Sequence, residues 1–112
     1  MEETMTEVFE ELYQTVLSRK SAKEEGSYTC YLFEKGIDKI LKKCGEECTE
    51  MVIAAKNADN DELKNEIADL LYHIMVMCVE RGLEWKDVEE ILAQRSSKTG
   101  NLKTFHQVDK NT

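Results

Sequence analysis

The sequence predicts an all-α protein, an antiparallel bundle of about four helices, on three observations. The 112-residue chain contains no proline and is rich in Glu, Lys, Leu and Ala, which favour helices. Its apolar residues recur with a helical period of 3.6 rather than the strand period of two. Hydrophobic residues make up 41% of the chain and charged residues 34%, a composition typical of globular proteins. The length suits one domain.

The first predicted helix covers residues 4–19, where apolar side chains recur at positions i and i+4. A polar loop at residues 18–28 follows. The next helical segment is longer, residues 29–57, and Gly36 and Gly45 interrupt it. Each glycine costs about 1 kcal/mol relative to alanine within a helix. A kink, a close helix crossing or a ligand contact would explain either glycine.

Residues 57–61 form a predicted turn, in which Asp59 and Glu62, three positions apart, resemble a capping box. The helix that begins there is expected to end at Arg81, because Gly82 can adopt the left-handed conformation that stops a helix. The short turn makes this helix an antiparallel neighbour of the segment before it.

Residues 70–79 are apolar on nearly every side and are the expected core of the bundle. A last helix at residues 85–97 completes a domain that spans residues 1–98. Residues 99–112 keep no sustained period and are interpreted as a poorly ordered or partner-dependent tail. The apolar stripes on residues 32–52 and 63–79 exceed what two short flanking helices can cover, so homodimerisation is expected to complete the bundle.

Two pairs of carboxylates are the most informative feature of the sequence. Glu47 and Glu50 lie on one predicted helix, and Glu66 and Asp69 lie on the next. Members of a pair are three positions apart and therefore project from one helical face, beside apolar residues that make an unneutralised charge costly. Both pairs lie at similar heights above the turn. Since oxygen ligands suit Mg²⁺ or Mn²⁺, the sequence predicts a metal site that can hold a phosphate.

Basic side chains near these acids are candidates for binding a substrate phosphate. Lys43 is the first choice, because its i,i+4 spacing places it on the face of Glu47. Lys39 lies one helical turn earlier, and Arg19 ends the first predicted helix. Ordinary surface charge is the alternative for each of them.

Three further residues are candidates for substrate binding. Ser27 and Thr29 lie at the start of a helix, where a hydroxyl can cap the helix or the free N–H groups can bind phosphate. His73 lies seven residues after Glu66 on the same stripe. It would contact the substrate or serve as a hydrogen-bonded histidine of the core.

The net charge, the length of the apolar runs, the N-terminal segment and the spacing of the cysteines argue against several classes of protein. A net charge of −8 opposes binding to nucleic acid, and no apolar run reaches the length of a membrane span. No secretory signal precedes the first helix. The four cysteines contain no C-x-x-C pair and are expected to be small buried thiols of a reducing compartment rather than zinc ligands. A cytoplasmic protein is therefore expected.

Three segments together resemble a known family, over about residues 6–95. They are Ser27-Tyr28-Thr29, Lys43-x-Gly45-Glu46-Glu47-x-x-Glu50 and Glu66-Ile67-Ala68-Asp69-Leu70-Leu71-Tyr72-His73. The acidic residues alone resemble the MazG-like all-α nucleotide pyrophosphohydrolases. The other residues narrow the resemblance to phosphoribosyl-ATP pyrophosphohydrolase of histidine biosynthesis.

This resemblance implies Mg²⁺-dependent hydrolysis of phosphoribosyl-ATP to phosphoribosyl-AMP and pyrophosphate by a helical homodimer. It assigns Glu47, Glu50, Glu66 and Asp69 as metal ligands and catalytic carboxylates. Two alternatives remain: a house-cleaning nucleoside triphosphate pyrophosphatase, and a non-catalytic helical bundle that binds a metal or a partner. A ferritin-like di-iron site is excluded, because it needs two Glu-x-x-His motifs and the chain has none.

Overall fold

Five α-helices and no strand make up the computed structural model over the residues that it describes, 2–22 and 24–97. The helices are α1 Glu2–Ser21, α2 Tyr28–Lys35, α3 Ile37–Lys56, α4 Asn60–Arg81 and α5 Trp85–Ser96. The predicted all-α class is confirmed. The expected tail at residues 99–112 lies outside the described residues. Within those residues no helix is both long and apolar enough to cross a membrane.

The fifth helix arises because Gly36 divides the segment that was expected to be one interrupted helix. Gly36 has φ 97° and ψ −177°, a conformation that side chains with a Cβ rarely adopt. Its N–H closes α2 with a 3.0 Å hydrogen bond to the Leu32 carbonyl. Gly45, by contrast, stays helical inside α3. Only the first of the two glycines therefore breaks the helix.

The predicted caps of α4 are both present. The Asp59 carboxylate accepts a 3.1 Å hydrogen bond from the Glu62 N–H. Gly82 has φ 74°, and the next N–H, that of Leu83, reaches back to the Cys78 carbonyl at 2.8 Å. The turn before α4 is short because Ala58 adopts the left-handed conformation, with φ 57°.

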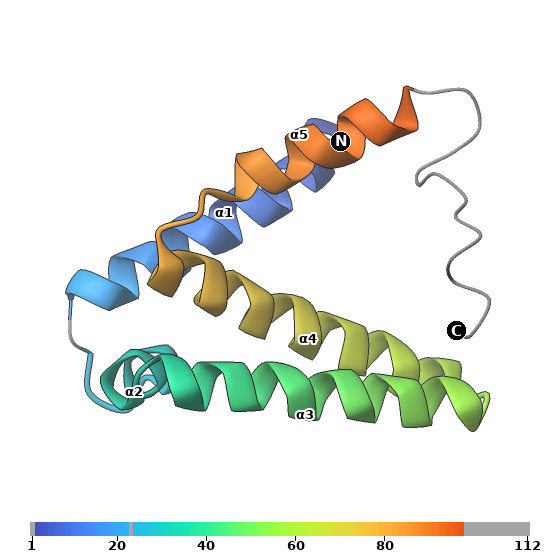
Figure 1. Ribbon diagram of the computed structural model, residues 1–112, viewed down its shortest axis with the longest axis horizontal. Helices are drawn as coiled ribbons and strands as arrows, with labels where there is room; N and C mark the ends of the chain where they lie inside the picture. Colours follow the sequence, from blue (N-terminus) through green and yellow to red (C-terminus); the bar gives the residue numbers. More distant parts are fainter. Residues whose placement is uncertain (1, 23, 98–112) are drawn as a thin grey trace, which may run out of the picture.

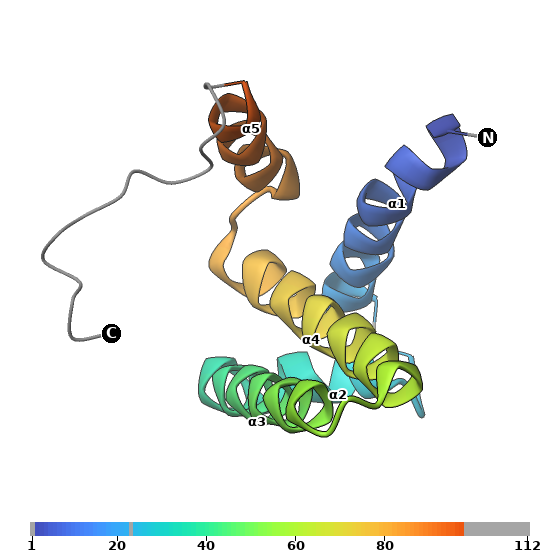
Figure 2. The same ribbon diagram turned by 90° about the vertical axis from the view of Figure 1, so that its right-hand side faces the viewer.

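The helices form two arms that diverge from the α2 end of the molecule (Figures 1 and 2). The antiparallel α3–α4 hairpin is one arm and has the most extensive helix contact of the fold. α1 packs on α4, and α2 lies against the start of α3. α5 joins α1 through Trp85, whose ring centroid is 5.5 Å from that of Phe9. The Tyr13 hydroxyl donates to the Leu83 carbonyl at 3.0 Å and ties α1 to the α4–α5 connection.

The core lies where α1, α2, α3 and α4 meet. Its fully buried side chains are Val16, Leu32, Ile40, Met75 and Val76. Cys78 and Val79 extend the core along α4, so the expectation that residues 70–79 form the core is confirmed. Cys78 alone among the cysteines is buried, whereas Cys48 is exposed. The expectation of four buried thiols is therefore wrong.

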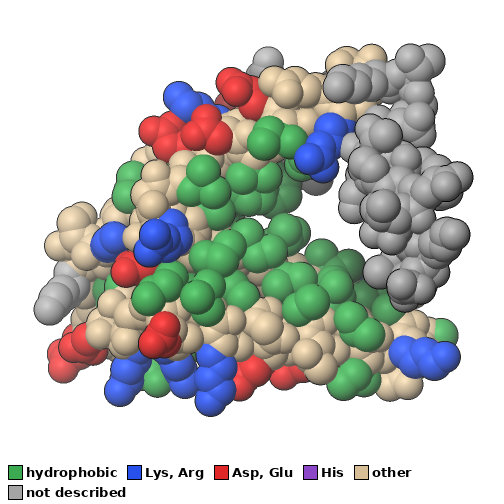
Figure 3. Space-filling view, in the orientation of Figure 1, with side chains coloured by type: hydrophobic (Ala, Val, Ile, Leu, Met, Phe, Trp, Pro, Cys, Tyr) green, Lys and Arg blue, Asp and Glu red, His purple; other side chains and the backbone are tan. Residues whose placement is uncertain are grey.

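Many large apolar side chains remain exposed on this single chain. Figure 3 shows hydrophobic side chains gathered where the two arms face each other. The large hydrophobic residues with substantial exposure are Val8, Leu17, Tyr28, Tyr31, Leu41, Val52, Ile53, Ile67, Leu83, Ile91 and Leu92. A monomer seldom exposes so much contiguous apolar surface.

Candidate active site

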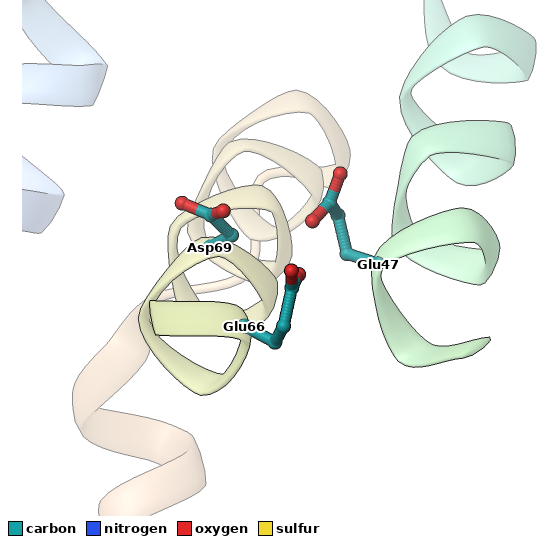
Figure 4. Close-up of side chains that lie close together, drawn as sticks. All are labelled: Glu47, Glu66 and Asp69. Carbon is teal, nitrogen blue, oxygen red and sulfur yellow. The ribbon is translucent and has the colours of Figure 1, made fainter. Parts of the chain in front are cut away.

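Three carboxylates from two helices meet on the α3–α4 hairpin. Glu47 reaches across from α3, and Glu66 and Asp69 project from α4 (Figure 4). One oxygen from each residue lies within 4.8 Å of the other two. Glu47 and Glu66 are only 7% and 9% exposed, whereas Asp69 faces solvent. The predicted facing register therefore brings three of the four assigned acids together.

Two of the buried carboxylate oxygens lack a hydrogen bond. Within the described part of the chain, Oε1 of Glu47 and Oε1 of Glu66 have no partner. A buried carboxylate oxygen without a partner is costly, and like charges add repulsion. A hard divalent cation bound between these oxygens would satisfy both and neutralise the charge. The donor set, all oxygen, therefore fits Mg²⁺ or Mn²⁺.

The crowding of acids changes the protonation of Glu66. Its pKa is raised from 4.5 to about 7, chiefly by a hydrogen bond with the Glu62 carboxyl. Burial is the next cause, followed by the charge and hydrogen bond of Glu50. Near neutral pH, a proton shared among these carboxyls reduces the repulsion between their negative charges, as a bound cation would. Binding of a cation should therefore release this proton.

Glu50, the fourth assigned acid, lies at the edge of this cluster. It is exposed and does not belong to the close group of three, although it acts on the Glu66 carboxyl. A three-residue step on a helix turns a side chain by about 300°, so Glu47 and Glu50 point in directions about 60° apart. Glu47 thus faces α4 while Glu50 borders solvent.

Glu62 lies next to the site, although its spacing from Asp59 in the sequence indicated only a role in helix capping. The Asp59 N–H bonds to the Ala54 carbonyl at 3.3 Å, so the reciprocal half of the capping box is not formed. The Glu62 side chain contacts Glu66 instead. The i,i+4 spacing of Glu62 and Glu66 was the signal for this contact.

Lys43 is the basic residue next to the carboxylates. Its Nζ lies 3.5 Å from Oε2 of Glu47 and 3.3 Å from Oε1 of Glu46. Burial lowers the pKa of Lys43, but the Glu46 hydrogen bond and the nearby Tyr28, Glu46 and Glu47 together raise it above the ordinary value. The predicted contact with Glu47 is present. Lys39 lies one turn earlier, half-buried, and makes no ion pair with any described residue.

His73 lies behind the carboxylates, inside the protein. The ring is buried, with Nδ1 2.7 Å from the Asp69 backbone carbonyl and Nε2 3.0 Å from the Tyr28 hydroxyl. Of the two roles considered for it, these contacts fit the hydrogen-bonded core histidine. Tyr28, which was not assigned to the site, connects His73 to the edge of the cluster. Burial raises the pKa of Tyr28, while nearby Lys43 lowers it and Glu47 raises it.

The remaining assigned residues lie near the corner between α1 and α2. Ser27 caps α2 by accepting a 3.2 Å hydrogen bond from the Cys30 N–H. Thr29 Oγ1 is hydrogen-bonded to the Tyr72 hydroxyl, and Arg19 pairs with Glu24 at 2.9 Å. Arg19 and Ser27 also line a cavity of about 1060 Å³. Tyr28 belongs to the wall of the same cavity.

Comparisons with known proteins identify the family of this chain. Residues 9–96 match the family described as phosphoribosyl-ATP pyrophosphohydrolase. The phosphoribosyl-ATP pyrophosphatase of Streptococcus sanguinis (strain SK36) is 53% identical over 102 residues, which cover 91% of this chain and 98% of that protein. The one from Streptococcus thermophilus is 57% identical over 95 residues, 85% and 91% of the two chains. That of Lactiplantibacillus plantarum is 53% identical over 94 residues, 84% and 89%.

Proposed function

Since the chain belongs to the phosphoribosyl-ATP pyrophosphohydrolase family, we propose that it hydrolyses phosphoribosyl-ATP to phosphoribosyl-AMP and pyrophosphate in histidine biosynthesis. The observation that carries this proposal is the close group of Glu47, Glu66 and Asp69, in which two buried oxygens lack partners. These three residues, with Glu50 at the edge, are proposed to hold Mg²⁺. Bound there, the cation would neutralise phosphate oxygens and stabilise charge that develops during cleavage.

The side chains around the cation position have separate tasks. Lys43, half-buried beside Glu47, offers an ammonium group to a phosphate oxygen that approaches the cluster. Glu66 holds a proton near neutral pH only while the cation is absent, when its pKa is raised to about 7, and it gives up this proton when the cation binds. Glu50 faces solvent next to Glu66 and is best placed to accept the proton of the attacking water.

The same proposal includes a homodimer. The exposed apolar residues on α1, α3 and α5, among them Val8, Val52, Ile53 and Leu92, support it, because a second copy of the chain would cover them. We assign the enzyme to the cytoplasm, since four free thiols suit a reducing compartment.

Release of pyrophosphate tests the proposed activity directly. The purified protein is given phosphoribosyl-ATP, ATP or dCTP, each with and without Mg²⁺. We expect turnover of phosphoribosyl-ATP only with the metal and far less turnover of the other two. Preference for ATP or dCTP would favour the house-cleaning triphosphatase. A protein that accelerates none of the three reactions would be the non-catalytic bundle.

A further inference from the structure

The cavity at the α1–α2 corner has one wall residue, Tyr28, that lies near Lys43 and Glu47, whereas none of the four assigned acids lines it. Its volume of about 1060 Å³ is large enough for the base and sugar of a nucleotide. Its wall contains two basic residues, several acids and three aromatic rings, those of Tyr28, Tyr31 and Phe33. The chemistry of this wall indicates which part of a substrate it suits.

The charges of the wall disfavour a phosphate. Arg19 is paired with Glu24 at 2.9 Å, and Lys20 is paired with Glu80 at 3.4 Å. Both basic residues are thus already neutralised by carboxylates that also line the cavity. Glu25 and Glu34 line it as well, so two cations face four carboxylates. An anion would be repelled here, whereas hydroxyl and amino groups of a ligand would find hydrogen-bond acceptors.

The aromatic rings supply a surface for stacking. The Tyr28 and Tyr31 rings are stacked on each other, with centroids 6.0 Å apart and planes 25° from parallel. Both side chains are partly open to solvent, at 44% and 38% exposure. Aromatic rings at the surface bind nucleobases by stacking, whatever the base. The exposed Lys35 ammonium lies 5.8 Å from the centroid of the Tyr31 ring, so a base that stacks on that face would displace it.

Tyr28 connects the cavity with the carboxylate cluster. It forms part of the cavity wall, and its hydroxyl lies 3.0 Å from Nε2 of His73. His73 in turn bonds to the backbone of Asp69, at 2.7 Å. Tyr28 therefore lies between the cavity and the proposed metal site, and a phosphate chain that extends from a ligand in the cavity would have to pass it.

From these four observations we propose that the cavity is the subsite for the purine and ribose of the nucleotide substrate. The base stacks on Tyr31, the ribose hydroxyls donate to carboxylates of the wall, and the phosphate chain passes Tyr28 toward Glu47 and Asp69. This inference rests on the proposed function, because it assigns one part of that substrate to one part of the molecule.

Steady-state kinetics of two matched variants test the stacking. Tyr31→Ala should raise KM for phosphoribosyl-ATP about tenfold with kcat within twofold, an effect typical of losing a stacking ring. Tyr31→Phe keeps the ring and should behave like the parent. The inhibition constant of tripolyphosphate, which has no base, should be the same in all three proteins. The subsite is overturned if Tyr31→Ala has the parent KM, if Tyr31→Phe is equally impaired, or if tripolyphosphate weakens in parallel.

A charge variant separates a nucleoside subsite from a phosphate subsite. Glu34→Gln removes one negative charge from the wall without changing its size. If the cavity took phosphate, this variant would bind inorganic phosphate, a probe without ribose, more tightly than the parent in the absence of Mg²⁺. We expect its affinity for inorganic phosphate to be unchanged, and tighter binding would overturn the assignment.

Binding of adenosine tests the subsite independently of the proposed reaction. In calorimetry, adenosine should bind the parent and Tyr31→Phe equally, and Tyr31→Ala about tenfold more weakly. This result without any turnover of phosphoribosyl-ATP would reject the proposed function and keep the subsite. Turnover together with adenosine binding that does not depend on Tyr31 would reject the subsite alone.

Discussion

The Tyr28 hydroxyl lies 3.0 Å from Nε2 of His73, whose Nδ1 lies 2.7 Å from the Asp69 backbone carbonyl. Because a carbonyl oxygen only accepts, Nδ1 carries the proton, and in the neutral ring Nε2 accepts from the tyrosine. These two hydrogen bonds connect α2 to the turn of α4 that carries Asp69. The position of α2 and the orientation of that turn are therefore coupled.

Removing the tyrosine hydroxyl tests this coupling. Tyr28→Phe leaves the buried Nε2 of His73 without its donor and should lower the free energy of unfolding by about 1 kcal/mol, measured by urea denaturation. Tyr31→Phe is the matched control, since no hydrogen bond of the Tyr31 hydroxyl is found among the described residues. Equal stability of the two variants would mean that the Tyr28 hydrogen bond contributes nothing.

Neutralising one buried carboxylate should abolish most of the activity without lowering the stability of the metal-free protein. Glu47→Gln and Glu66→Gln should each lower kcat by orders of magnitude, because each removes a proposed metal ligand. Without metal, both should unfold at the parent temperature or above it, since one like charge has left the cluster. Glu89→Gln, at an exposed position of α5, should change neither property. Clustering of the acids is refuted if the metal-free variants melt well below the parent.

Protons and Mg²⁺ should each stabilise the folded protein, but over different ranges of pH. The folded metal-free chain holds a proton on Glu66 with a pKa of about 7, against an ordinary value of 4.5. A raised pKa in the folded state stabilises the fold below the ordinary value, and this contribution is lost as pH rises through about 7. The metal-free protein should therefore become more stable as pH falls from above 7 toward 4.5. Mg²⁺ should stabilise it most above 7, by ~2.7 kcal/mol at a hundredfold excess over Kd.

Thermal melts with and without Mg²⁺ across this pH range measure both effects. Protons and metal compete for the same oxygens, so the metal's contribution should shrink as the pH falls. A double variant, Glu50→Gln with Asp69→Asn, should lose most of it at every pH. An unchanged melting temperature on adding Mg²⁺ at neutral pH, or equal stabilisation of the double variant, would place the metal elsewhere.

Sedimentation velocity tests the proposed dimer. At micromolar concentration the parent should sediment as a dimer, because Val52, Ile53 and other large apolar residues are exposed on the single chain. Ile53→Asp places a charge among them and should shift the protein toward monomer or impair its folding. A parent protein that is monomeric and well folded at that concentration contradicts the proposal.

Local signals in the sequence were sufficient for most of the fold. Periodicity predicted the helices, Asp59 and Gly82 were recognised as the caps of α4, and the short turn gave the antiparallel pair. The break at Gly36 and the continuity at Gly45 could not be distinguished, because both residues permit either conformation and only packing selects one. The family assignment made from three motifs is confirmed by the match over residues 9–96.

The site was predictable in composition but not in detail. Spacing alone placed Lys43 beside Glu47 and aligned the two acidic pairs. Which acid of a pair is buried depends on the crossing of α3 and α4, and a side chain about 60° further around the helix becomes exposed, as Glu50 does. Tyr28 reaches His73 only because α2 folds back onto α4, a long-range contact that no local pattern encodes.

Because the turn at Ala58 is tight, the effect of inserting residues into the chain depends on where they are inserted. The close carboxylates all lie on two consecutive helices, so their assembly needs no closure of a long loop and can begin as soon as the hairpin forms. Extra residues between α1 and α2 would leave this geometry intact. One residue added inside α4 between its first turn and Glu66 would instead shift Glu66 and Asp69 by about 1.5 Å and rotate them by about 100° away from Glu47. The spacing along this stretch of chain is therefore as much a determinant of the site as the acids themselves.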